Sequence, residues 1–92
     1  MSTVPQNDDV AILERVIAPE NGNLDEVTAS YFLSLTFSEK DRARMRELSA
    51  RARDGSLSSS ETDEINRYER IGHFLSILHS KARCSLKRSH RN

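Results

Sequence analysis

One stretch in the C-terminal half of the chain decides the fold. Residues 57–86 read LSSSETDEINRYERIGHFLSILHSKARCSL. At 100° per residue, seven side chains of this stretch fall within an arc of about 80°, which is the core-facing stripe of an amphipathic helix. They are Leu57, Tyr68, Ile71, Leu75, Leu78, Ala82 and Leu86. Ile77 falls on the opposite face, so the middle of the helix is apolar nearly all round and is expected to have neighbours on more than one side.

The start of this helix is strongly specified. Ser58 is a favourable N-cap, and Glu61 stands three residues later at the reciprocal position of a capping box. Gly72 interrupts the interior at a cost of about 1 kcal/mol relative to alanine. Because no proline is near to cause a bend, we expect another helix to approach closely at Gly72.

Three shorter helices are expected before the long one. Asp8 or Asp9, Asp25 and Ser38 are suitable N-caps, and Gly55 is a suitable stop for the third helix. The expected core positions are Val10, Leu13, Val16 and Ile17 in the first helix, Val27, Tyr31 and Leu35 in the second, and Met45, Leu48 and Ala52 in the third. Helices this short do not persist in water unless they are packed. The sequence therefore predicts an all-α protein, a small helical bundle of three short helices packed on one long C-terminal helix.

Composition supports one small domain. The chain has 92 residues, of which 36% are hydrophobic and 30% are charged, a balance that suits helices with one buried and one solvated face. We expect a disordered leader over 1–7, a single helical domain over 8–88 and a basic tail over 89–92. Neither a membrane span nor a secretory signal is visible, and the lone Cys84 excludes an internal disulfide, so a cytoplasmic location is predicted.

Charge is distributed unevenly along the chain. Residues 1–30 hold six acids against Arg15 alone, and residues 70–92 hold six bases and no acid. One interpretation is that the basic end complements the dipole of the long helix and keeps the chain in solution. The other is that it contacts phosphates or an acidic protein surface, with Lys81, Arg83, Lys87, Arg88 and Arg91 as the candidate phosphate contacts.

The third predicted helix is rich in arginine. Its five arginines are Arg42, Arg44, Arg46, Arg51 and Arg53. Four acids are interleaved with them, which favours a solvated face of mixed charge over a nucleic-acid contact.

The length of the last helix predicts a partner. Thirty helical residues span about 45 Å, whereas a compact domain of this size is about 32 Å across. The apolar stripe continues into the expected overhang, so it needs a cover: a second copy in a dimer, another protein, or the acidic N-terminal helix folding back. The candidate partner-binding residues are Leu75, Leu78, Ala82 and Leu86.

The sequence offers little catalytic chemistry. It contains no Gly-rich phosphate loop, no His-Glu-x-x-His and no Gly-x-Ser-x-Gly. His73 and Cys84 would lie about 16 Å apart along the helix axis, and His79 points elsewhere, so these three cannot share one ion. We therefore expect no catalytic residue, no cofactor, no metal and no enzymatic activity.

Several segments together resemble a known group of proteins. They are FSEKDRARMREL at 37–48, DGSLS at 54–58, residues 61–68, GHFL at 72–75 and HSKAR at 79–83. Over residues 24–88 the chain resembles short uncharacterised bacterial proteins that are all-helical and in some genomes are encoded beside an HNH-type nuclease. The Gly-x-Leu-Ser-x-x-Glu segment from Gly55 to Glu61 is similar to stretches in small antitoxin and accessory proteins. The resemblance implies a bacterial cytosolic partner protein and supplies no catalytic residue.

The sequence thus predicts a non-enzymatic helical accessory or antitoxin-like protein that binds another protein through its long C-terminal helix. The alternative is a small nucleic-acid-binding protein that uses the basic C-terminal end. Salt separates the two, because phosphate contacts weaken steeply as salt rises and an apolar interface does not.

Overall fold

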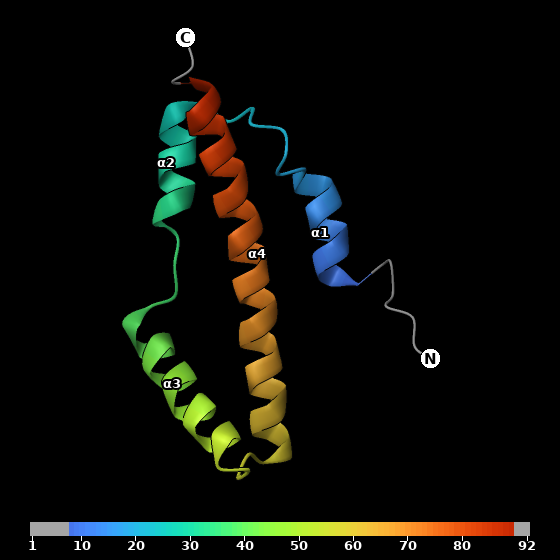
Figure 1. The fold of residues 1–92 in the computed structure, drawn as a ribbon, viewed down its shortest axis with the longest axis vertical. Coiled ribbons are helices and arrows are strands. Elements are labelled where there is room, and N and C mark those ends of the chain that lie inside the picture. Colours follow the sequence, from blue (N-terminus) through green and yellow to red (C-terminus); the bar gives the residue numbers. More distant parts are fainter. Residues whose placement is uncertain (1–7, 90–92) are drawn as a thin grey trace. The chain divides into compact units, whose positions relative to one another are not determined.

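The computed structural model describes residues 8–89, which contain four helices and no strand. The helices are α1 (Asp9–Ile17), α2 (Glu26–Ser34), α3 (Glu39–Arg53) and α4 (Ser59–Ser89) (Figure 1). The predicted all-α class, with three shorter helices packed on one long C-terminal helix, is confirmed. The predicted leader over 1–7 and all but the first residue of the predicted basic tail lie outside the described residues.

The chain is organised as two compact units that share α4. Residues 8–35 and 73–89 belong to the first unit, and residues 36–72 form the second. The range predicted as one domain, 8–88, therefore contains two packing units. α1 and α2 belong to the first unit and α3 belongs to the second.

The helices begin where local hydrogen bonding favours a start. Asp8 accepts the backbone N–H of Ala11 at 2.8 Å, and Asp25 accepts that of Thr28 at 2.7 Å. Ser38 accepts a backbone N–H in the same way, from Asp41 at 3.2 Å. All three predicted N-caps are confirmed, with Asp8 rather than Asp9 capping α1.

The capping box predicted for α4 is complete. The N–H of Ser58 donates to Oε1 of Glu61 at 3.0 Å, and the N–H of Glu61 donates to Oγ of Ser58 at 3.1 Å. Gly55, with φ +70°, occupies the left-handed region after α3. This conformation suits glycine best and agrees with its predicted role as a helix stop.

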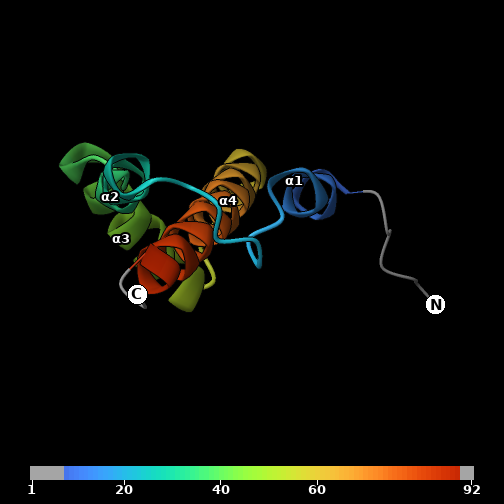
Figure 2. The ribbon, with the colours of Figure 1, turned by 90° about the horizontal axis from the view of Figure 1, so that it is seen from above.

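The core of the first unit lies along the C-terminal half of α4. Ala29 and Ala82 have no exposed surface, and Ile77 is 9% exposed. α1 and α2 lie on opposite sides of this part of α4 (Figures 1 and 2). Ile77 is thus buried as predicted. The sequence predicted that this part of α4 needs a cover, and the N-terminal part of the chain packs in the same unit.

The predicted inner faces of the short helices need correction. Val16, Val27 and Tyr31 are 74%, 80% and 61% exposed, and Ala52 is also exposed. In α2 the buried residue is Ala29, which has no exposed surface. The predicted stripe through Val27 and Tyr31 therefore exists but faces away from the core.

The second unit packs α3 against the first half of α4. Leu48 is fully buried, as predicted. The ring of Phe37 meets the ring of Tyr68 edge to face at a centroid distance of 5.8 Å, and the Tyr68 hydroxyl donates to Asp41 at 2.8 Å. Tyr68 thus makes an apolar contact with Phe37, just before α3, and a hydrogen bond to Asp41 within α3.

The close approach predicted at Gly72 is wrong. A Cβ added there would lie 4.0 Å from the Phe37 ring, an ordinary van der Waals distance, and would meet nothing else within 4 Å. The close approach occurs instead at Gly22, in the loop between α1 and α2. A Cβ on Gly22 would lie only 2.7 Å from the backbone carbonyl carbon and oxygen of Cys84.

Gly72→Ala is accordingly expected to stabilise the protein. The substitution removes the helix penalty of glycine, about 1 kcal/mol, and the site has room for the methyl group. We expect a melting temperature a few degrees higher by circular dichroism. A fall in melting temperature would mean that something packs closely at this position after all.

Candidate functional site

The predicted partner stripe on α4 is largely used inside the chain. Leu75, Leu78 and Leu86 are half-buried, and Ala82 has no exposed surface. The prediction that Ala82 contacts a partner is therefore wrong in this conformation, because the first unit encloses it. Of the three covers considered from the sequence, the acidic N-terminal helix folding back is nearest to the structure, in which α2 packs in the same unit as well.

Lys81 holds the end of α1. Its side chain is 9% exposed, and Nζ donates to the carbonyl oxygens of Ile17 at 2.6 Å and of Ala18 at 3.4 Å. Carbonyl groups at a helix C-terminus carry partial negative charge, which favours a cation there. The prediction that Lys81 contacts phosphate is wrong, because the ammonium group is buried and already bonded.

Two further polar side chains of α4 bind the segments packed on it. Nε2 of His79 donates to the carbonyl oxygen of Leu35, at the end of α2, at 2.8 Å. Ser85 is buried, with 2% of the residue exposed, and its Oγ accepts a hydrogen bond from the backbone N–H of Leu24 at 3.1 Å. We call His79, Lys81 and Ser85 the polar clamp. Its bonds join residues 44 to 64 positions apart, so helical periodicity could not reveal them.

The other predicted phosphate contacts on α4 remain at the surface. Arg83, Lys87 and Arg88 are exposed, whereas Arg91 lies outside the described residues. They give α4 a small basic end, and the structure brings no further predicted phosphate contact to it.

Exposed apolar pairs occur on both short helices of the first unit. On α1, Ile12 and Val16 are 43% and 74% exposed. On α2, Val27 and Tyr31 are 80% and 61% exposed and lie one helical turn apart. We call Val27 and Tyr31 the α2 apolar pair. Its spacing was visible in the sequence, but its outward direction was not.

An ion-pair network joins α3 to the first half of α4. Nε and Nη2 of Arg44 donate to the two carboxylate oxygens of Glu64 at 2.9 and 2.8 Å, and Nη1 donates to Glu47 at 3.0 Å. Arg51 pairs with Glu47 at 3.0 Å and also with Glu61. A planar guanidinium that binds a carboxylate through two hydrogen bonds fixes orientation as well as charge.

Two carboxyl groups of this network have a pKa below the usual value. For Glu64 the main cause is the hydrogen bonds from Arg44. For Glu61 it is the backbone hydrogen bond from Ser58, followed by the charge of Arg51. The carboxylates in turn raise the pKa of Arg44. Each carboxyl group is thus held in its charged form by the fold.

The stability of the protein should therefore fall in acid. A carboxyl group whose folded-state pKa lies below its usual value of 4.5 contributes stability above pH 4.5, and this stability is lost as the pH falls through the folded-state pKa. We expect the melting temperature to fall progressively below that pH. Glu64→Gln should melt lower than wild type at neutral pH and show a flatter acid limb.

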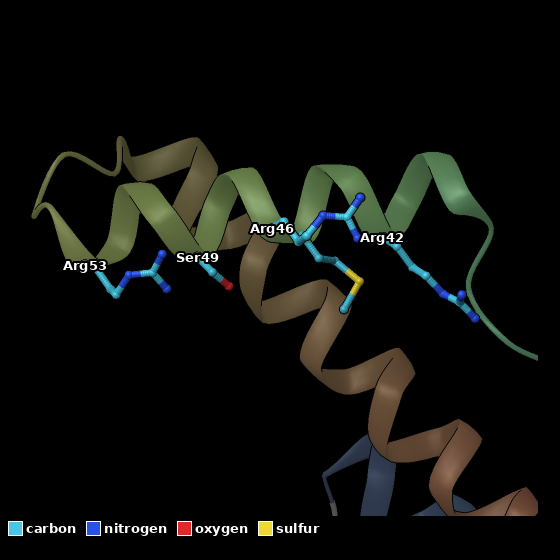
Figure 3. A pocket seen from close by; sticks show the side chains of 5 residues that line it. Arg42, Arg46, Ser49 and Arg53 are labelled. Atoms are coloured by element: carbon cyan, nitrogen blue, oxygen red, sulfur yellow. The ribbon is translucent and has the colours of Figure 1, made fainter.

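A shallow hollow of about 440 Å³ lies along α3. Its lining residues are Arg42, Met45, Arg46, Ser49 and Arg53. Figure 3 shows that the four labelled side chains project from one side of the helix. The sequence indicated the arginines of α3 but not their separation into two groups, since that depends on the acids of α4.

Within residues 8–89, no group of three or more His, Cys, Asp or Glu side chains is placed to hold a metal ion. None of the described helices has the length and apolar character needed to cross a membrane.

No family model, curated protein or solved structure matches the chain.

Proposed function

We propose that this chain is a non-enzymatic helical accessory or antitoxin-like protein of the bacterial cytoplasm that binds another protein through α2. The observation that carries the proposal is the exposure of the α2 apolar pair, Val27 at 80% and Tyr31 at 61%. Recognition of a helix in an apolar groove commonly uses large side chains one turn apart as anchors. Tyrosine is also among the residues most enriched at the energetic centres of interfaces.

The proposal places the binding surface on α2 rather than on α4. On α4, Leu75, Leu78 and Leu86 are half-buried and Ala82 is buried, and α1 and α2 lie on either side of this part of the helix (Figures 1 and 2). The α2 apolar pair faces outward from the same unit and is left without apolar cover in the described chain. Burial of this tyrosine and valine against a partner would be favourable, which supports a role in binding.

Charge indicates what kind of partner would fit. Asp25 and Glu26 stand at the start of α2, which contains no basic residue. A complementary partner would therefore carry an apolar groove with a basic rim. Proteins that bind nucleic acid present basic surfaces of this kind. The resemblance to proteins encoded beside an HNH-type nuclease makes such a nuclease the first partner to test.

Titration calorimetry with that nuclease tests the proposal. Val27→Ala combined with Tyr31→Ala should raise the dissociation constant by about 30-fold or more. Anchors of this kind contribute at least about 2 kcal/mol to the binding free energy. The matched control is Ile12→Ala combined with Val16→Ala, which removes the exposed apolar pair of α1. The control should change the affinity by less than about threefold, and both variants should keep the wild-type circular dichroism spectrum.

Two results would count against the proposal. Equal weakening by the α1 and α2 variants would show that binding does not depend on α2. Absence of a complex with the nuclease, together with a dimer mass by light scattering that reverts to monomer in the α2 variant, would show that the partner is a second copy of the chain.

A further inference from the structure

The arginines of α3 divide into two groups with different environments. Arg44 and Arg51 belong to the ion-pair network and are bonded to Glu47, Glu61 and Glu64. The other three lie outside the network, and all are exposed. These are Arg42, Arg46 and Arg53, which we call the outer arginines. None of these three arginines forms an ion pair with a carboxylate of α4 in the described part of the chain.

The outer arginines are only lightly engaged. Arg42 donates to the hydroxyl of Thr36 at 2.9 Å, a neutral acceptor. Arg46 pairs with Glu39 at 3.3 Å, and both side chains are largely exposed, at 67% and 77%. Arg53 makes no hydrogen bond or ion pair within the described part of the chain. Weak exposed pairs of this kind contribute little and are readily exchanged for a ligand.

The same three residues line the hollow on α3. At 100° per residue, its five lining residues fall within an arc of about 100° on one side of the helix (Figure 3). No carboxylate is among them. Met45 and Ser49 lie between the arginines and add an apolar surface and a hydroxyl group. The hollow is therefore a row of oxyanion-binding groups with a small apolar floor.

We propose that the outer arginines bind consecutive phosphates of a single-stranded nucleic acid. Arg42 and Arg53 are separated by about 16 Å along the helix axis. Each strand of double-stranded DNA carries one phosphate per about 3.4 Å of helix axis, so a single strand stacked in the same way would place roughly five phosphates along this distance. Each guanidinium group then finds a phosphate whatever the register of the strand.

An acidic protein segment is a less suitable ligand for this row. It offers carboxylates only where its own sequence places them, so three contacts would need one matching spacing. A single strand also presents its bases and sugars at the side, where Met45 provides an apolar contact. The site lies in the second unit and shares no residue with the α2 apolar pair, so the two proposals fail separately.

Fluorescence anisotropy with a labelled twelve-nucleotide single strand at low salt tests this site. The variant Arg42→Gln, Arg46→Gln and Arg53→Gln should bind at least about tenfold more weakly than wild type. For wild type, log affinity should fall with log salt at a slope of about −2, because three phosphate contacts to a single strand each contribute about −0.7. The slope for the variant should approach zero.

The control removes the same charge elsewhere. Arg83→Gln with Lys87→Gln and Arg88→Gln neutralises three exposed cations of α4. It should change the affinity by less than about threefold, and circular dichroism should show both variants folded. Equal weakening by the two variants would overturn the proposal, because attraction would then follow net charge alone.

Competition identifies the source of the negative charge. Displacement of the strand by a polyglutamate of equal length at equal concentration would overturn the phosphate assignment in favour of an acidic protein. Displacement by tripolyphosphate at the same concentration as an unlabelled strand would overturn the strand assignment, because a short anion would then suffice. Displacement by the unlabelled strand alone would support the proposal.

Discussion

Gly22→Ala is expected to destabilise the protein by about 3 kcal/mol, the upper part of the range for overpacking a buried site. The added Cβ would lie 2.7 Å from the carbonyl carbon and oxygen of Cys84 and 2.8 Å from the nitrogen of Ser85. These are backbone atoms within α4, so no side chain can turn aside to make room. The loop must move away from α4, and the hydrogen bond between Leu24 and Ser85 would be lost with it.

Urea unfolding monitored by circular dichroism measures this loss. Gly55→Ala is a suitable control, because that glycine has φ +70° and nothing within 4 Å of its added Cβ. It should cost only about 1 to 2 kcal/mol, from left-handed backbone strain without a clash. If Gly22→Ala is no more costly than Gly55→Ala, the loop does not pack against α4 as described.

Lys81→Ala is expected to lower the free energy of unfolding by a similar amount, about 3 kcal/mol. It removes the charge-assisted hydrogen bond to Ile17, for which about 1.5 to 3 kcal/mol is typical, and also the packing of the buried aliphatic stem. Lys81→Met keeps most of the stem and removes the ammonium group, so it should cost about 2 kcal/mol. The difference between the two variants gives the contribution of the stem.

The same variants make a prediction specific to α1. No residue of α1 is fully buried, so we expect the bond from Lys81 to Ile17 at its end to contribute much to its attachment. Backbone amides of α1 should exchange faster with solvent in Lys81→Met, while those of α3 should keep their wild-type rates. Lys87→Met, at an exposed position on α4, is the control and should change stability by less than about 0.5 kcal/mol. A Lys81→Met protein as stable as wild type would mean that this bond contributes nothing net.

The features that could be predicted from the sequence are those set by residues three or four positions apart. The N-caps at Asp8, Asp25 and Ser38 and the capping box at Ser58 are of this kind. The class and the number of helices follow from them. The burial of Ile77 was predictable because the middle of α4 is apolar on every side.

The inner faces of the short helices were not predictable in the same way. α2 carries apolar side chains around much of its circumference, so its periodicity does not select one face. The buried face of α2 is the one that contains Ala29. It is set by packing within the first unit, which joins residues far apart in the sequence. Lys81 and Ser85 were hidden for a related reason. Polar residues are usually exposed, and their burial here depends on partners 61 and 64 positions away.

The position of Gly72 at the boundary between the two units has a consequence for how the protein unfolds. The second unit ends at Gly72 and the first unit resumes at His73, within one unbroken helix. Helix formation is cooperative, so a folded half of α4 acts as a nucleus for the other half. Helix that propagates from one half to the other must include Gly72. Glycine disfavours the helix by about 1 kcal/mol relative to alanine. We therefore expect Gly72→Ala to strengthen the coupling between the two units and to bring their melting transitions closer together.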